Sequence, residues 1–180
     1  MEKKEQENQT YPKYAPGTHV RTSDIREKKI TYTWWEPEIQ YAWSVGNAMS
    51  KFLQGLKEGK ILGVHCHKCD RVITPPRSFC EYCYGPTEDW VELKDTGTIN
   101  TYSVSYLDPN ANRIEEPIFI GVISIDGAYP KPMGFMHYFG EVSKDEIKIG
   151  MKVKAVWKPE DEREGSINDI KYFKPLRGGE

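Results

Sequence analysis

The chain has 180 residues, of which 38% are hydrophobic and 29% charged, and its mean hydropathy is −0.68. No apolar run approaches the roughly 20 residues that a membrane-spanning helix needs, which argues against a helical membrane protein. With 25 basic and 27 acidic side chains, the formal net charge of −2 provides no overall positive field for nucleic acid or anionic lipid. The first nine residues are charged and polar, without the apolar segment of a secretory signal, which predicts a cytoplasmic protein.

Residues 1–33 form a polar segment that prolines interrupt, and neither helical nor strand periodicity is sustained in it. We therefore expect an extended N-terminal arm. Its tyrosines and the following Trp34 and Trp35 are too many large apolar groups for a simple linker, so the arm should lie on another surface.

Residues 34–60 predict one amphipathic helix. Between residues 37 and 58, apolar side chains recur every three or four positions and would share one helical face: Ile39, Ala42, Trp43, Val45, Met49, Phe52, Leu53 and Leu56. Pro37 suits the first helical turn, and Gly59 suits a C-cap. Gly46 and Gly55 each cost about 1 kcal/mol relative to alanine, so we expect tertiary packing to hold this helix.

Residues 61–90 contain all four cysteines in the pattern C-x2-C, ten residues, C-x2-C: Cys66, Cys69, Cys80 and Cys83. Two thiolate pairs supply the four soft ligands of a closed tetrahedral zinc site, in which zinc is structural because no position remains for water. The alternatives are two disulfides, a redox C-x-x-C, or iron in a rubredoxin-like role. A cytoplasmic compartment disfavours disulfides, and a redox motif does not need a matching second pair. His65 and His67 flank the first pair, but the symmetric spacing favours four cysteine ligands.

Residues 91–175 predict a small β-barrel, and residues 176–180 a tail. Five strand-like segments, separated by Gly, Pro and Asp clusters, cover residues 102–106, 118–125, 133–139, 151–157 and 167–173. Residues 142–150 suit the helical turn that often connects the third and fourth strands of an OB barrel. The fold class is therefore mainly β with an N-terminal α-helical segment, in which a rubredoxin-like zinc ribbon precedes a five-stranded OB-fold barrel.

No catalytic residue is assigned. If the metal takes all four cysteines, no thiol remains to act as an acyl-carrying nucleophile. His19 and His137 stand alone in the sequence, and no triad, G-x-S-x-G elbow or Gly-rich phosphate loop accompanies them.

The order of these parts resembles the acyl-CoA-associated family of zinc-ribbon plus OB-fold proteins, long classed as a domain of unknown function. The resemblance covers about residues 36–175. It is carried by residues 59–63 after the helix, the two cysteine pairs, Pro75-Pro76-Arg77, Thr96-Gly97-Thr98-Ile99, residues 116–127 and residues 149–153. The chain departs from the family in a longer arm before Trp34, and in Asp70, which replaces the glycine often found after the second cysteine.

The resemblance implies a non-catalytic accessory subunit of a thiolase-superfamily complex. Such subunits are thought to bind or channel the CoA ester and to stabilise a thiolase-fold large subunit that supplies the catalytic groups. An acyl-CoA thiolase, of a β-oxidation-like or benzoylsuccinyl-CoA type, is the first expectation for the partner. A steroid side-chain aldolase or a hydroxymethylglutaryl-CoA synthase complex is the alternative, and the sequence leaves the acyl group and the partner open.

Three cations near the ribbon are candidates for binding CoA phosphates: Arg77, Arg71 and Lys68. Arg77 is the first choice because a planar guanidinium can hold phosphate through two hydrogen bonds. For a partner interface we expect Trp34, Trp35 and Trp43, since aromatic anchors dominate interfaces. Packing of Trp43 on the protein's own ribbon or barrel is an equal alternative.

Two other function classes remain. A nucleic-acid-binding module is disfavoured because the barrel loops over residues 108–116 and 158–165 are rich in acidic residues, which repel phosphate. A stand-alone hydrolase lacks a nucleophile, and a rubredoxin-like electron carrier would hold iron rather than zinc.

Overall fold

The computed structural model describes residues 20–31, 38–87 and 89–177, and the chain divides into two units, Met1–Ala42 and Trp43–Glu180. In the first unit, the five-residue helix α1 spans Thr22–Arg26 within the predicted extended arm. The Asp24 carboxylate stabilises its start by accepting a hydrogen bond of 2.9 Å from the backbone N–H of Arg21. Trp34 and Trp35 lie outside the described residues.

The second unit begins with helix α2, Gly46–Lys57, which is shorter than the predicted helix. The prediction over residues 38–45 was wrong, because this stretch is neither helix nor strand. Gly46 has a φ of +78°, a left-handed conformation that interrupts a right-handed helix. Upstream, Ile39 and Trp43 are 65% and 77% exposed, so little apolar burial offsets the cost of helix formation. The predicted C-terminal end is confirmed by Gly59, whose φ is +77°.

The ribbon contains three short antiparallel strands in the order β2–β1–β3. They are β1 (Ile61–Cys66), β2 (Arg71–Ile73) and β3 (Asp89–Leu93). In the central strand, Val64 pairs with Ile73 on one side and Trp90 on the other. In the described part of the ribbon, the buried cluster around the metal centre consists of Val64, Cys66, Ile73 and Cys80, so this end of the ribbon has little apolar core of its own without a metal.

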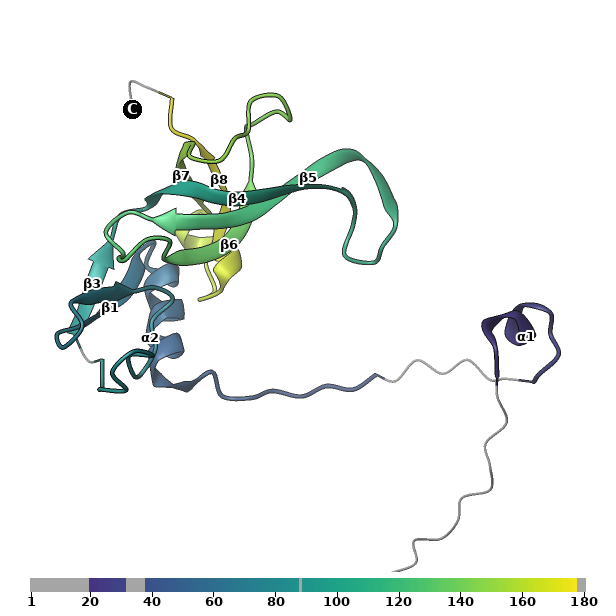
Figure 1. Cartoon of the computed structure of the whole chain (residues 1–180), viewed down its shortest axis with the longest axis horizontal. Helices are drawn as coiled ribbons and strands as arrows, with labels where there is room; N and C mark the ends of the chain where they lie inside the picture. The colour runs from purple at the N-terminus through teal and green to yellow at the C-terminus, as the bar shows by residue number, and fades with distance from the viewer. Residues whose placement is uncertain (1–19, 32–37, 88, 178–180) are drawn as a thin grey trace, which may run out of the picture. The chain divides into compact units, whose positions relative to one another are not determined.

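Five further strands close into a barrel, as predicted, and their order is β4–β5–β6–β8–β7 (Figure 1). Their bounds are β4 (Thr96–Leu107), β5 (Arg113–Ile125), β6 (Gly134–Phe139), β7 (Lys152–Trp157) and β8 (Ile170–Pro175). β4 closes the ring because it pairs with both β5 and β7, and β6 pairs with β8 in parallel. The first two strands are longer than the sequence predicted.

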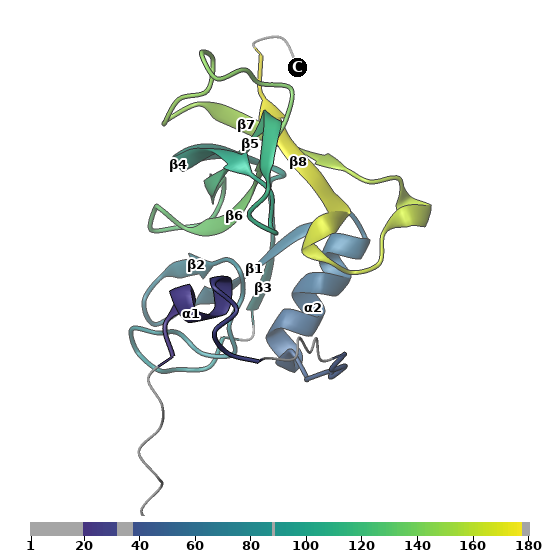
Figure 2. The same ribbon diagram turned by 90° about the vertical axis from the view of Figure 1, so that its right-hand side faces the viewer.

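One apolar core joins α2, the ribbon sheet and the barrel. Phe52 and Leu56 of α2 are 2% and 0% exposed, and they belong to the same buried cluster as Ile61 of β1 and Phe173 of β8. Helix α2 lies against β1 (Figure 2). The helix therefore depends on tertiary packing, as its two glycines led us to expect, and this packing lies within the chain.

The other helical segments are single turns. In the connection from β6 to β7, the backbone N–H of Ile147 donates to the Ser143 carbonyl at 3.0 Å, which forms the predicted helical turn without a continuous helix. Two 3-10 turns, η1 (Glu160–Glu162) and η2 (Ile167–Asp169), lie between β7 and β8. Among the helices of the described ranges, none is long and apolar enough to span a bilayer.

Candidate metal centre

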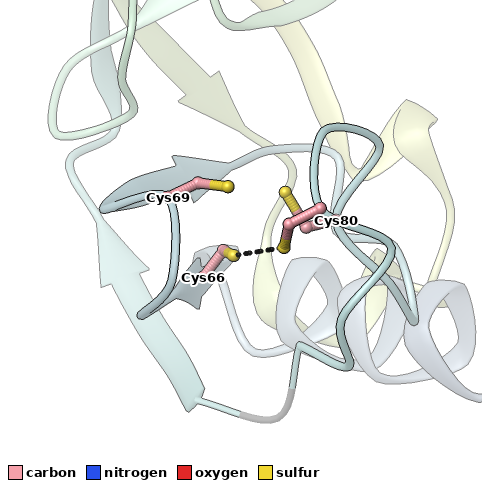
Figure 3. A group of neighbouring side chains, drawn as sticks. Cys66, Cys69 and Cys80 are labelled. Atoms are coloured by element: carbon pink, nitrogen blue, oxygen red, sulfur yellow. Dashed lines mark hydrogen bonds between the residues drawn. The ribbon is translucent and has the colours of Figure 1, made fainter.

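The four cysteines converge from two turns of the ribbon. Cys66 ends β1, Cys69 lies in the turn before β2, and Cys80 and Cys83 lie in the segment between β2 and β3. Their sulfur atoms all lie within 4.8 Å of one another, and the Sγ atoms of Cys66 and Cys83 are 3.6 Å apart (Figure 3). Tetrahedral zinc with metal–sulfur bonds of roughly 2.3 Å places its ligand sulfurs roughly 3.8 Å apart, so the cluster fits this ion.

The cluster does not contain a disulfide, because all four cysteines are free thiols. Cys66 and Cys80 are 2% and 0% exposed, and the centre has four protein ligands for a tetrahedral ion. The arrangement therefore fits a structural zinc that joins the two turns.

The backbone prepares the cluster for a metal. Hydrogen bonding from the Tyr82 backbone N–H lowers the pKa of the Cys80 thiol to about 6, against the opposing effect of burial. The hydrogen bond with Cys83, reinforced by burial, raises the pKa of Cys69 to about 12. A divalent cation stabilises thiolates, so its binding overcomes the mutual repulsion that four thiolates would suffer without it.

Each cysteine pair is followed by a residue in the left-handed region. Asp70 follows Cys69 with a φ of +48°, and Tyr84 follows Cys83 with a φ of +56°. Glycine has no steric penalty in this conformation, and aspartate tolerates it better than most residues. The hydroxyl of Tyr129 donates to Asp70 Oδ1 at 2.8 Å. Asp70, which replaces the glycine often found at this position in the family, therefore makes a tertiary contact that glycine could not make.

The flanking histidines have partners other than the cysteine sulfurs. His65 Nε2 lies 3.0 Å from Asp70 Oδ1, and His67 Nε2 lies 2.5 Å from Asp89 Oδ2. The alternative in which a histidine replaces a cysteine ligand is therefore not supported by the geometry. Asp89 and Tyr129 were missed by the sequence analysis, because nothing in the local pattern places either beside the first cysteine pair.

The three predicted phosphate-binding cations occupy different environments. Arg71 is only 8% exposed, its Nη1 lies 2.8 Å from Glu81 Oε1, and its guanidinium lies 3.9 Å from the centre of the Tyr82 ring. Arg77 is exposed, and its Nη1 atom lies 3.9 Å from Glu81 Oε2. Lys68 is exposed in the turn between Cys66 and Cys69. The structure thus brings the two arginines together around Glu81. Arg77 is the more exposed of the two, so a phosphate could reach it more easily.

A pocket of about 320 Å³ lies between α2 and the ribbon. It is lined by Asn47, Ala48, Lys51, Ser78, Thr87 and Trp90. Lys51 Nζ lies 4.3 Å from the centre of the Trp90 ring, and the Thr87 hydroxyl donates to the carbonyl of Arg77. The pocket therefore combines an aromatic wall with a cation and adjoins the Arg77 backbone. Lys51 was missed by the sequence analysis because its position on α2 carries no motif.

Trp43 is the only predicted interface residue within the described part of the chain, and it is 77% exposed. Trp43 is therefore not buried in the core, and its role at an interface stays a prediction.

His137 has a structural environment. It is 5% exposed, its Nε2 lies 3.1 Å from the Ile167 carbonyl oxygen, and its Nδ1 accepts a hydrogen bond from the Tyr138 backbone N–H at 2.8 Å. Burial lowers the pKa of His137, which favours the neutral ring. Both ring nitrogens therefore have hydrogen-bond partners within the second unit. His19 lies outside the described residues.

Comparison with known proteins agrees with this architecture. Residues 53–89 match the model of the ChsH2 rubredoxin-like zinc ribbon domain, and residues 90–158 match that of the ChsH2 C-terminal OB-fold domain. No curated protein matches the chain significantly.

The solved structures similar to this one include the following two. A protein of unknown function from the DUF35 family of Sulfolobus solfataricus is 28% identical, with a TM-score of 0.54, and the alignment covers 72% of this chain and 84% of that chain. A structure described as the Ltp2-ChsH2(DUF35) aldolase is 20% identical, with a TM-score of 0.53, and the alignment covers 74% of this chain and 98% of that chain. At 20% identity, the similarity to this second structure shows a shared fold and no shared function.

Proposed function

Because this chain belongs to the ChsH2 (DUF35) family of zinc-ribbon and OB-fold proteins, we propose that it is a non-catalytic accessory subunit of an acyl-CoA-processing enzyme. A second, larger subunit of thiolase fold supplies the catalytic groups. This chain stabilises that subunit and contributes one wall of the site that holds the CoA ester.

The observation that carries the proposal is the convergence of all four cysteines on one metal centre. Thiolytic acyl transfer needs a nucleophile, and a thiolate bound to structural zinc is not available for that purpose. The partially exposed tryptophan-lined pocket next to Arg77 supports a role in binding instead.

The pocket suits part of a CoA ester by its chemistry, because it combines an aromatic wall with a cation. CoA carries phosphates at one end and a slender pantetheine arm at the other. In this proposal the arm lies along Trp90, and Arg77 and Lys51 contact the phosphates. Arg71, which already pairs with Glu81, orients that carboxylate beneath Arg77, and Lys68 contributes only long-range attraction.

An aldolase is a second candidate for the large subunit. The structure described as the Ltp2-ChsH2(DUF35) aldolase pairs a protein of this fold with an aldolase, so retro-aldol cleavage is the alternative to thiolytic cleavage as the reaction of the complex. In both cases the substrate is a CoA ester, so the role of this chain is the same.

To test the proposal, the chain is co-purified with its partner from the native host. Calorimetry then measures the affinity of the free chain and of the complex for CoA. The free chain should bind CoA weakly, and the complex should bind it more tightly. Arg77→Ala and Lys51→Ala should each weaken binding to the complex, whereas Lys148→Ala, which removes an exposed cation of the barrel, should not.

The second measurement is turnover of the thioester by the large subunit with and without this chain. Equal turnover in both samples would contradict the shared site. A salt-sensitive affinity for single-stranded DNA, without any for CoA, would instead favour the nucleic-acid-binding alternative.

A further inference from the structure

A second group of metal-binding side chains lies beside the cysteine centre. One ligand atom from each of His65, His67 and Asp89 lies within 4.8 Å of the other two. The imidazole rings of the two histidines have centroids 4.7 Å apart and are nearly perpendicular, with an interplanar angle of 83°. None of the three belongs to the four-cysteine set.

The ribbon sheet places these side chains together. His65 is paired directly with Asp89 across β1 and β3. His67 lies just beyond the end of β1, in the turn that leads to Cys69, and its Nε2 atom contacts Asp89 Oδ2. Strand register therefore places His65 opposite Asp89, and the contact of His67 with Asp89 brings the third side chain into the cluster.

The group contains a hydrogen-bonded support for one of its imidazoles. Asp70 Oδ1 lies 3.0 Å from His65 Nε2 and also accepts a hydrogen bond of 2.8 Å from the Tyr129 hydroxyl. A carboxylate that contacts one imidazole nitrogen is the usual support of a metal-bound histidine, in which the other nitrogen is the ligand atom.

The other two side chains can adjust to an ion. His67 Nε2 and Asp89 Oδ2 are 2.5 Å apart, and their side chains are 74% and 60% exposed. In the absence of a metal this contact is an ion pair or a hydrogen bond. A cation takes the place of the proton between the two atoms and needs only small rotations of these exposed side chains to reach bonds of roughly 2.0–2.2 Å.

We propose that His65, His67 and Asp89 form a second, exchangeable site for a divalent transition metal, distinct from the structural zinc. Two imidazoles and one carboxylate favour borderline ions such as Zn²⁺, Co²⁺ and Ni²⁺ over Ca²⁺ or Mg²⁺, which prefer oxygen ligands. Three protein ligands leave at least one coordination position for water or an anionic group. The site does not depend on the proposed function.

The experiment uses the full-length chain with its structural zinc in place. Equilibrium dialysis against low micromolar Zn²⁺, followed by elemental analysis, should give two zinc ions per chain. His67→Ala and Asp89→Ala should each reduce this to one. Asp70→Asn, which tolerates the left-handed backbone, should weaken the second site by about 10–100-fold, as expected for loss of a carboxylate that supports a metal-bound histidine.

The matched control is Asp161→Ala, which removes an exposed carboxylate elsewhere and should retain two ions. Titration with Co²⁺ separates the two centres, because cobalt bound to thiolates absorbs strongly by charge transfer and cobalt bound to nitrogen and oxygen does not. A single zinc ion in the unmodified chain would overturn the proposal. Retention of the second ion in both His67→Ala and Asp89→Ala, or a thiolate band that accounts for all bound cobalt, would also overturn it.

Discussion

The ring of Phe52 in α2 packs edge-to-face against Phe135 in β6, with ring centroids 6.1 Å apart and an interplanar angle of 72°. Phe135 makes a similar contact with Phe173 of β8, at 6.2 Å. This row of rings ties the helix that precedes the ribbon to the barrel that follows it. The ribbon is consequently held at both of its ends by a core to which its own cysteines do not contribute.

Removal of the Phe52 ring should destabilise the whole second unit. We expect Phe52→Ala to lower the free energy of unfolding by about 3–5 kcal/mol, because the substitution loses apolar burial and leaves a cavity. Urea denaturation of the zinc-loaded chain measures this change. Met136→Ala is the control, since Met136 is 61% exposed and its loss should cost about 0.5 kcal/mol or less. A comparably small effect of Phe52→Ala would show that α2 does not pack on the barrel.

Loss of one cysteine ligand should release the zinc. Cys80→Ser should reduce zinc binding at this centre to zero and unfold residues 61–93 locally, because the energy of metal binding is part of the folding energy of the ribbon. Elemental analysis and hydrogen exchange report the two effects. Ser78→Ala, a substitution in the same segment, should retain the metal. Stoichiometric zinc in a Cys66→Ser/Cys69→Ser double variant that also lacks the His67 side chain would contradict the four-cysteine assignment.

The buried carboxylate of Asp169 should make stability depend on pH. Its two oxygens accept hydrogen bonds of 3.0, 2.8 and 3.0 Å from the backbone N–H groups of Glu164, Gly165 and Ser166. Burial acts to raise the pKa of Asp169, but these hydrogen bonds outweigh it and hold the pKa below the ordinary value of 3.8. The stabilisation is therefore fully present above that value and is lost as the pH falls through the lower pKa of the folded state.

Asp169→Asn tests this account. We expect a loss of about 1.5–3 kcal/mol near neutral pH, because the amide group offers only one oxygen to three donors. The difference from the unmodified chain should shrink as the pH falls below 3.8. Denaturation across a pH series measures it, with the exposed Asp161→Asn as the control. A difference that stays constant down to the lowest pH would show that the carboxylate charge is not responsible.

Exposed residues before α2 should become protected in the proposed complex. In the free chain, we expect backbone amides of residues 38–45 to exchange rapidly and those of Phe52 and Leu56 to be protected, because only the latter lie in the core. On addition of the large subunit, residues 38–45 should become protected. Trp43→Ala should weaken that complex by at least about tenfold, the effect expected of an aromatic anchor.

Lys57→Ala serves as the control for Trp43→Ala, since it removes an exposed cation at the other end of the helix segment. Unchanged affinity in Trp43→Ala would remove Trp43 from the interface and leave the rest of the segment to be tested.

Local patterns in the sequence were sufficient for the ribbon and the barrel. The spacing of the four cysteines identifies the metal centre because two C-x2-C turns present paired thiolates whatever surrounds them. Alternating apolar residues and turn residues predict the five barrel strands for a similarly local reason, since side chains of a strand alternate between two environments. The resemblance to the zinc-ribbon and OB-fold family rests on these same segments and is confirmed by the domain matches.

Tertiary structure decided where α2 begins and which polar groups meet. Apolar periodicity continues upstream of Gly46, but a helix needs a surface to pack on, and Ile39 and Trp43 are exposed. Tyr129 is distant in sequence from Asp70 and His65, and only the folding of the barrel segment onto the ribbon brings the three together. Such contacts depend on the path of the whole chain, so short-range sequence patterns contain no signal for them.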